Sequence, residues 1–137
     1  MGEKWLKKIV YKTNTSSLHR IDDLLGIFNT ANYTLDLYTL NGWFISKLKL
    51  PVKDITEGRW TTEIYIDKID YKAYTSFLTK GGNFTLYQVD LNTGELKRKL
   101  SAKQGYPQKV KVYKNFLFYL YDIPGEGDNK QLFRQKL

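Results

Sequence analysis

The sequence predicts an all-β fold made of repeated antiparallel meanders, and three observations lead to this prediction. Aromatic residues are abundant, with 11 Tyr, 7 Phe and 3 Trp among 137 residues, and such side chains favour strands over helices. Turn-forming residues recur at the spacing of short strands, as in all-β domains. A short pattern also repeats: a strand containing Leu and an aromatic residue, a tight Asn/Gly turn, and a basic alternating strand.

The repeated pattern indicates how the meanders are organised. Clear copies lie at 37–48 and 86–100, a third begins at Leu132, and residues 2–9 resemble its missing second half. A repeat of about 50 residues whose first and last pieces complete each other is typical of β-propeller blades. We therefore expect a half β-propeller of about three four-stranded blades. Its N-terminal strand would close the last blade, in the same chain or in a partner chain.

The first predicted unit begins with an outer strand at 5–12, where apolar and polar positions alternate. A polar connector over 13–17 follows. Residues 19–25 fit either one helical turn or the beginning of a strand, and we favour a strand over 24–30. The remaining strands of this unit are expected at 33–40 and 43–50, joined by Asn41-Gly42, because both residues tolerate the positive φ of a hairpin turn.

The later units follow the same logic of apolar alternation interrupted by turn residues. We predict strands at 60–67, 73–79, 84–91 and 95–101, and then at 109–113, 116–121 and 131–137. Together they form one propeller-like domain over 1–137, with blade pieces at about 1–12, 19–51, 60–102 and 106–137.

Three blades cannot close a ring, because each blade needs neighbours on both faces. Two chains could pair as a homodimer to complete a six-bladed ring, or the chain could be half of a longer propeller. A third alternative is a different all-β fold whose hairpins look alike.

The chain is basic, with 22 Lys and Arg against 14 Asp and Glu and a formal charge of +8. This charge favours polyanionic partners such as nucleic acid or anionic lipid. However, lysines alternate with apolar residues at 47–50 and 109–112, which is typical of the wet face of protected edge strands, and we favour that interpretation. The absence of Cys excludes disulfides and thiol chemistry. No apolar run is long enough for a membrane span, no signal peptide is evident, and the compartment stays open.

Three segments could carry a catalytic or ligand-binding site, but each is also explained by an ordinary structural role. His19 precedes Asp22 and Asp23, so it could act as a general base, but a lone His is more often structural. The oxygen-rich loop 122–129 could wrap calcium, yet its residues are those of an exposed turn. Residues 80–83 lack the helix that follows a phosphate-binding loop. We predict no catalytic, cofactor-binding or metal residue, and we lean against an enzyme.

Aromatic residues alternate with lysines near the C-terminus. Tyr113, Phe116, Phe118, Tyr119 and Tyr121 interleave with Lys109, Lys111 and Lys114, as on a small β-barrel that binds single-stranded nucleic acid. Strand alternation places 116, 118 and 120 on one face and 117, 119 and 121 on the other, so both faces are apolar. That pattern is expected of a strand buried between two neighbouring blades. We favour core packing and regard nucleic acid as the less favoured partner.

Residues 60–137 resemble the C-terminal half of the six-bladed TolB-like β-propellers of Bacteroidetes. The resemblance is carried by 64–67, 86–95, 107–113, 118–121 and 132–137, and more weakly by 19–22. It implies a binding or scaffold role, and an exported or periplasmic location if a leader was removed. The leading hypothesis is a non-catalytic binding or scaffold module, with a protein or carbohydrate ligand that meets loops at one end of the strands. The alternative is a small basic β-barrel that binds single-stranded nucleic acid.

Overall fold

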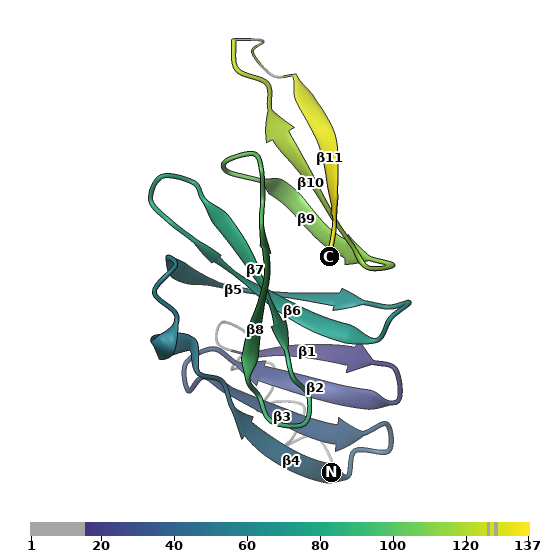
Figure 1. Cartoon of the computed structure of the whole chain (residues 1–137). Helices are drawn as coiled ribbons and strands as arrows, with labels where there is room; N and C mark the ends of the chain where they lie inside the picture. Colours follow the sequence, from purple (N-terminus) through teal and green to yellow (C-terminus); the bar gives the residue numbers. More distant parts are fainter. Residues whose placement is uncertain (1–15, 126, 128) are drawn as a thin grey trace.

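The computed structural model describes residues 16–125, 127 and 129–137. It contains three antiparallel sheets, none of them closed into a barrel within the described chain, which lie one after another in the order of the sequence (Figure 1). This confirms the all-β prediction and the repeated meanders. The first sheet contains β1 (Ser16–Ile21), β2 (Leu24–Asn29), β3 (Thr34–Thr39) and β4 (Phe44–Lys49).

A short 3₁₀ turn, η1 (Val52–Asp54), leads from the first sheet to the middle one. The middle sheet contains β5 (Arg59–Asp67), β6 (Lys72–Leu78), β7 (Phe84–Val89) and β8 (Leu96–Ser101). The last sheet has three strands: β9 (Gln108–Tyr113), β10 (Phe116–Asp122) and β11 (Lys130–Lys136), in the spatial order β11, β10, β9.

The prediction for the beginning of the first sheet was wrong in one respect. We expected a connector over 13–17 and left 19–25 open between helix and strand, whereas Ser16–Ile21 forms β1 and pairs along its length with β2. Asp22 takes a φ of 55° in the two-residue turn between Ile21 and Leu24. Asp tolerates this left-handed conformation well, so a tight hairpin replaces the helical turn. The strand predicted at 5–12 lies outside the described residues.

Two hairpin turns have the same hydrogen-bond pattern, in which a threonine before the turn accepts two backbone N–H groups, one of them from a glycine. The Gly42 N–H donates to the Thr39 carbonyl at 2.9 Å, and the Trp43 N–H donates to the Thr39 hydroxyl at 3.1 Å. Thr79 accepts in the same way from Gly82 and from Asn83, at 3.0 Å each. The turn predicted at Asn41-Gly42 and the plain turn predicted at 80–83 are both present.

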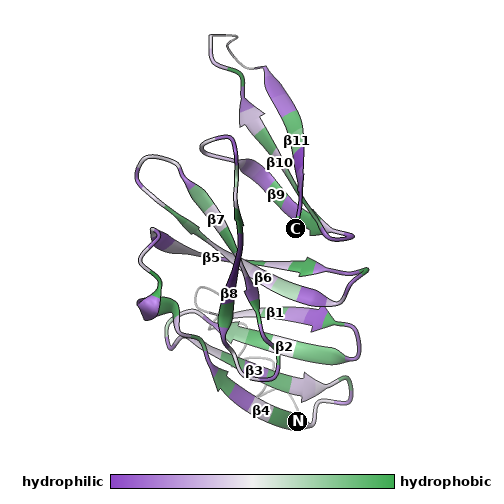
Figure 2. Ribbon diagram, in the orientation of Figure 1, coloured by the Kyte–Doolittle hydropathy of each residue, from purple (hydrophilic) through white to green (hydrophobic). Residues whose placement is uncertain are grey.

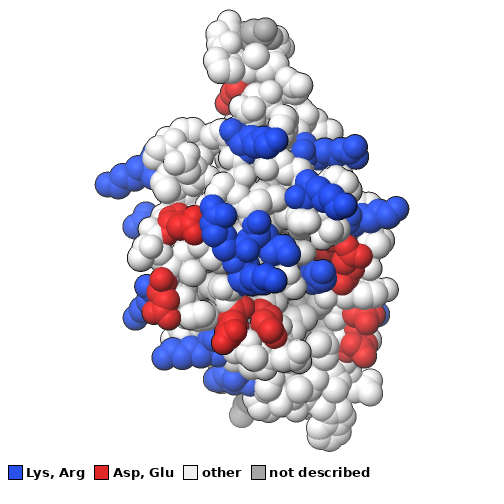
Figure 3. All heavy atoms as spheres, in the orientation of Figure 1, with Lys and Arg blue, Asp and Glu red and all other residues white. Residues whose placement is uncertain are grey.

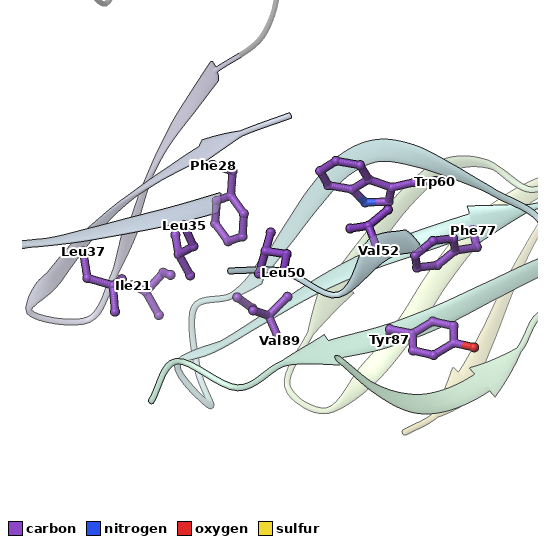
Figure 4. Packing of buried hydrophobic residues seen from close by; sticks show 11 residues of the cluster. Ile21, Phe28, Leu35, Leu37, Leu50, Val52, Trp60, Phe77, Tyr87 and Val89 are labelled. Atoms are coloured by element: carbon purple, nitrogen blue, oxygen red, sulfur yellow. The ribbon is translucent and has the colours of Figure 1, made fainter. Parts of the chain in front are cut away.

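The middle sheet is buried on both faces. One cluster fills the space between it and the first sheet (Figure 4): Ile21, Phe28, Leu35, Leu37, Leu50, Val52, Trp60, Ala73, Phe77, Tyr87 and Val89. A second cluster lies between it and the last sheet: Tyr74, Phe84, Leu86, Val112, Leu117 and Tyr119. Apolar residues are correspondingly dense along β6 and β7 (Figure 2). Residues of β6 alternate between the two clusters, as the period of two requires.

The last sheet is covered on one face only within the described chain. Leu117 and Tyr119 are buried against the middle sheet, whereas Phe116, Phe118 and Leu120 are half-exposed on the opposite face. The predicted division of β10 into two faces is therefore confirmed. The expectation that both faces of β10 are buried was wrong. Strands β6 and β7 are the ones buried on both faces, because only the middle sheet has a neighbouring sheet on each side within the described chain.

The carboxylate of Asp67 joins the middle and last sheets at the end of β5. Its two oxygens accept the backbone N–H groups of Ile69 and Asp70 in the β5–β6 turn, and those of Lys114 and Asn115 in the β9–β10 turn. Asp67 has no exposed surface. Burial acts to raise the pKa of this carboxyl, but the four N–H donors outweigh burial and hold the pKa below its ordinary value.

In each sheet, the edge strand that comes last in the sequence is basic. Figure 3 shows Lys and Arg gathered on the face of the molecule that β8 crosses. Strands β4, β8 and β11 contain no Asp or Glu, and their eight basic residues are Lys47, Lys49, Lys97, Arg98, Lys99, Lys130, Arg134 and Lys136. Each of these strands lies at the edge of its sheet, where charged side chains are expected.

Candidate functional site

One hollow lies at the loop ends between the first and middle sheets. This loop pocket has a volume of about 650 Å³, within the range typical of small-ligand sites. Its wall comes from the β2–β3 turn, the segment from β4 to η1 and the β7–β8 turn. The lining residues are Ala31, Asn32, Tyr33, Lys49, Leu50, Pro51, Lys53, Asp54 and Glu95.

Tyr33 is the aromatic centre of the loop pocket, and the local fold fixes its position. The Asn29 side chain accepts the N–H groups of Ala31 and Asn32 at 3.1 and 3.0 Å, which shapes the turn before Tyr33. Tyr33 itself has a φ of 57°, an uncommon conformation for a bulky residue. Its carbonyl accepts the N–H of Leu50 at 2.7 Å. Such strain often accompanies a functional loop.

The surroundings of the Tyr33 ring are amphipathic. The Lys53 ammonium lies 5.3 Å from the ring centroid, within cation–π range. The Trp60 ring also packs against the Tyr33 ring, with the centroids 5.9 Å apart and an interplanar angle of 57°. Asp54 and Glu95 add carboxylates to the same wall. An aromatic surface beside carboxylate and ammonium groups suits a ligand with both apolar faces and hydrogen-bonding groups.

Gly94 brings the β7–β8 turn into contact with the first sheet. A Cβ at this position would lie 2.6 Å from the Lys49 carbonyl oxygen and 3.1 Å from the Leu48 side chain. The φ of Gly94 is 81°, which favours glycine as well. The close approach places the neighbouring Glu95 at the rim of the loop pocket.

A second hollow, the strand groove, runs along the first strands of the three sheets. It has a volume of about 450 Å³. Its lining residues come from β1, from β5 and the turn after it, and from β9: Leu18, His19, Arg20, Glu63, Ile64, Tyr65, Ile66, Lys68, Val110, Lys111 and Val112. A smaller adjoining hollow shares Arg20, Ile66 and Lys68 and adds Asp22 and Tyr71.

A bulge in β5 shapes one wall of the strand groove. The pairing of β5 with β6 shifts register between Trp60 and Ile64, and Thr62 within this shift has a φ of 63°. This conformation is a genuine outlier for a β-branched residue. The bulge turns Thr62 and Glu63 toward solvent, where both are exposed.

Two buried hydroxyls of β6 hold the bulge from opposite faces of the sheet. Thr75 accepts the indole N–H of Trp60 at 2.6 Å and donates to the Glu63 carbonyl at 2.7 Å. Ser76 shares a hydrogen bond of 2.6 Å with the Thr61 hydroxyl. The bulge is thus anchored at both ends. No sequence signal identified it, because Thr and Glu are ordinary strand residues in such a position.

The structure places His19 on the wall of the strand groove, and among the described residues Ser17 is its hydrogen-bond partner. Its Nε2 lies 3.0 Å from the Ser17 hydroxyl, and its ring packs edge-on against Phe28 at 5.8 Å. Burial lowers the pKa of the imidazole, so neutral His19 is favoured near pH 7. Neither Asp22 nor Asp23 forms a hydrogen bond with the ring. A Ser–His pair without an orienting carboxylate lacks the third element of a nucleophilic triad.

The loop at 122–129 is closed by an ordinary turn contact, since the Ile123 N–H donates to the Asn129 carbonyl at 3.1 Å. The Asp122 carboxylate accepts hydrogen bonds from the Lys130 ammonium at 2.6 Å and the Gln108 amide at 2.9 Å. The hydrogen bond from Lys130 lowers the pKa of this carboxyl. Across the described residues, no three His, Cys, Asp or Glu side chains gather in a metal-binding arrangement.

The aromatic residues considered for nucleic-acid stacking are divided between two faces of the last sheet. Tyr119 is fully buried, and its hydroxyl donates to the Gln135 side chain at 2.8 Å. On the outward face, the Phe116 and Phe118 rings lie 6.2 Å apart, and the Arg134 guanidinium lies 5.0 Å from the Phe116 ring. The barrel expected for this alternative does not form, because none of the three sheets closes within the described chain.

Comparison with known proteins leaves the family open: no family model matches the chain, and no curated protein has a matching sequence. No helix among the described residues has the length and apolar character needed to cross a bilayer.

Proposed function

We propose that the chain is a section of a β-propeller and serves as a non-catalytic binding or scaffold module. The observation that carries this proposal is the stacking of the middle sheet between the first and last sheets, with apolar cores on both of its faces. Consecutive four-stranded meanders that bury their faces against one another are typical of propeller blades. The adjacency of β1, β5 and β9 along one groove agrees with the radial arrangement of such blades.

The outward faces of the first and last sheets support completion by a second copy of the chain. Leu18 and Phe44 on the first sheet are 48% and 58% exposed, and Leu132 on the last sheet is 63% exposed. Docking these faces would cover apolar surface.

Sedimentation velocity tests the paired arrangement directly. We expect a species of twice the 16.1 kDa chain mass, and we expect Phe118→Lys to shift it toward the monomer. Lys80→Gln, in the exposed β6–β7 turn, serves as the matched surface control. A well-folded wild-type chain that stays monomeric at high concentration would overturn pairing between copies.

The loop pocket is the proposed ligand site of the module. The fixed Tyr33 ring, together with the carboxylates and ammonium groups around it, suits a carbohydrate or an extended protein segment. Screening an oligosaccharide array and a peptide array with the wild-type chain and Tyr33→Ala tests this assignment. Ligands of this pocket should lose most of their binding in the variant, and hits that bind both proteins equally would place the site elsewhere.

Binding of single-stranded nucleic acid is the second candidate function, carried by one observation. The Phe116 and Phe118 rings lie side by side on the outward face of the last sheet, close to Arg134. Titration with oligonucleotides at several salt concentrations separates the two functions, because phosphate contacts give an affinity that falls steeply with salt.

A further inference from the structure

We propose that a hollow on the middle sheet is a second binding site, specific for a short acidic oligosaccharide whose sugar rings carry carboxylates. This hollow, the sheet-end pocket, has a volume of about 290 Å³, close to the lower end of the range for small-ligand sites. Its lining residues are Tyr71, Lys72, Gln88, Val89, Asp90, Leu91, Asn92 and Lys97. The proposal goes beyond the binding role of the loop pocket and does not depend on pairing between copies.

Strand register places three polar side chains of the sheet-end pocket on one face of the middle sheet. Gln88 of β7 lies directly opposite Tyr74 of β6 and Lys97 of β8, and Tyr74 packs toward the last sheet. Residues directly opposite each other in an antiparallel pair point to the same face, so Gln88 and Lys97 share the face of Tyr74. Lys72 lies two residues before Tyr74 on β6 and therefore points to this face as well.

The same register brings these side chains within reach of one another. Directly opposite residues such as Gln88 and Lys97 have Cβ atoms about 5 Å apart, and the diagonal spacing that relates Lys72 to Gln88 is about 7 to 8 Å. Lys97 is exposed, and Lys72 and Gln88 are half-buried. Because β7 lies between β6 and β8, the Gln88 amide is flanked by one lysine on each side.

Tyr71 supplies an aromatic surface to the sheet-end pocket. It is 52% exposed and has a φ of 55° in the turn that leads into β6. Asp67 shapes this turn, because its Oδ1 accepts the N–H groups of Ile69 and Asp70 at 3.0 and 3.1 Å. The position of Tyr71 is therefore tied to a buried carboxylate. A Tyr ring offers an apolar face and a hydroxyl, which suits the amphipathic surface of a sugar ring.

The β7–β8 turn supplies another wall of the sheet-end pocket and is held by Asp90. The Asp90 Oδ1 accepts the N–H groups of Asn92 and Thr93 at 2.8 and 3.2 Å, and its backbone carbonyl accepts the N–H of Gly94 at 2.7 Å. Among the described lining residues, Asp90 is the single carboxylate against two lysines. The charge of these groups favours an anion, while the carboxylate remains an acceptor for ligand hydroxyls.

The groups of the sheet-end pocket have counterparts in a uronic acid, a sugar that carries a carboxylate. Lys72 and Lys97 can form charge-assisted hydrogen bonds with carboxylates. The Gln88 amide both donates and accepts, as hydroxyl groups require, and the Tyr71 ring can cover the apolar side of a sugar ring. Strand β8 also crosses a face rich in Lys and Arg (Figure 3), and such a field raises the local concentration of anions.

Titration monitored by two-dimensional NMR of the full chain tests the proposal. The probes are digalacturonic acid, the neutral disaccharide galactobiose, and the dipeptide Glu-Glu blocked at both termini, which has two carboxylates but no sugar ring. We expect digalacturonic acid to bind at least about tenfold more tightly than either other probe, because only this probe offers both a charge-assisted contact and a ring for Tyr71. The amides that shift should be those of residues 71–72, 88–92 and 96–97.

Single substitutions identify the groups responsible. Lys72→Gln and Lys97→Gln should each weaken binding of digalacturonic acid about tenfold, which corresponds to loss of one charge-assisted contact. Tyr71→Ala should weaken it by a similar factor through loss of the ring. Lys80→Gln and Tyr113→Ala are the matched controls, since Lys80 is exposed in the β6–β7 turn and Tyr113 is 51% exposed. Both controls should bind as the wild type does. The unchanged amide spectrum of each variant away from the substitution serves as the folding check.

Three outcomes would overturn the proposal. One is binding that Lys80→Gln weakens as much as Lys72→Gln does, and another is equal affinity for the blocked dipeptide, since either would indicate attraction to charge alone. The third is the absence of any saturable shift at the sheet-end pocket with all three probes. Tyr33→Ala, which disables the loop pocket, should leave binding of digalacturonic acid intact, so failure of one site is distinguishable from failure of the other.

Discussion

The carboxylate of Asp67 and the backbone N–H of Asn115 form a hydrogen bond of 2.8 Å that joins two sheets across 48 residues of sequence. Lys114 and Asn115 both have positive φ in this turn, at 50° and 66°. That geometry turns their successive N–H groups toward the same acceptor. The buried carboxylate therefore shapes the β9–β10 turn while it fixes the last sheet to the middle one.

Removing this carboxylate should destabilise the chain strongly. Asp67→Ala leaves four backbone N–H groups without their acceptor, and we expect a loss of about 3 kcal/mol in the free energy of unfolding. Urea denaturation measures this loss. Asp70→Ala, in the same turn but exposed, should cost less than about 0.5 kcal/mol. Equal losses in the two variants would refute the anchoring role of Asp67.

Acid should weaken the same anchor. Because the folded-state pKa of Asp67 lies below its ordinary value, its contribution to stability is fully present above the unfolded-state pKa of about 4 and is lost as pH falls through the folded-state value. The stability difference between wild type and Asp67→Ala should therefore be constant from neutral pH to about pH 5 and shrink below that. A difference that stays constant down to pH 3 in thermal unfolding would contradict this linkage.

The close approach of Gly94 to the first sheet predicts a sharp response to a single methyl group. Gly94→Ala should lower stability by about 2 to 3 kcal/mol, because strain at positive φ adds to a collision with the Lys49 carbonyl. Gly125→Ala is a matched control, since Gly125 has a similar φ of 79° but no atom of the described residues within 4 Å of the added Cβ. It should cost only about 1 kcal/mol. Similar losses at both positions would mean that the contact with Lys49 contributes nothing.

Trp60 and Thr75 should be energetically coupled. The Thr75 hydroxyl satisfies the buried indole N–H of Trp60 and the Glu63 carbonyl at once. Thr75→Val should cost about 2 kcal/mol, because it leaves both groups without a partner. In the background of Trp60→Phe, which lacks the N–H group, the same substitution should cost about 1 kcal/mol less. A double-mutant cycle measured by urea denaturation gives this difference, and strict additivity would exclude the coupling.

The sequence predicted the strands well because apolar alternation and turn residues act locally. Asn41-Gly42 marked its hairpin, and the face division of β10 followed from period two alone. The first strand was missed because Ser16 and Ser17 carry no apolar signal, and they enter the sheet through pairing with Asn29 and Phe28. Such pairing depends on residues that are remote in sequence.

The candidate sites were far less predictable than the strands. The loop pocket requires Tyr33 to meet Lys53 and Glu95, and the strand groove requires the first strands of three sheets to lie side by side. Neither arrangement has a fixed spacing in the chain. His19 was visible as a chemical candidate, but only the structure shows that its ring contacts Ser17 and Phe28 rather than a carboxylate.

The basic outer strands restrict how copies of this protein can meet. If two molecules approached with these edge strands facing each other, the positive charges of β4, β8 and β11 would repel, because none of the three strands contains an acidic residue. Uncontrolled lateral growth into continuous fibrils is thereby disfavoured, while approach through the broad faces stays open. High salt, which screens this repulsion, should be the condition under which the protein becomes most prone to precipitate.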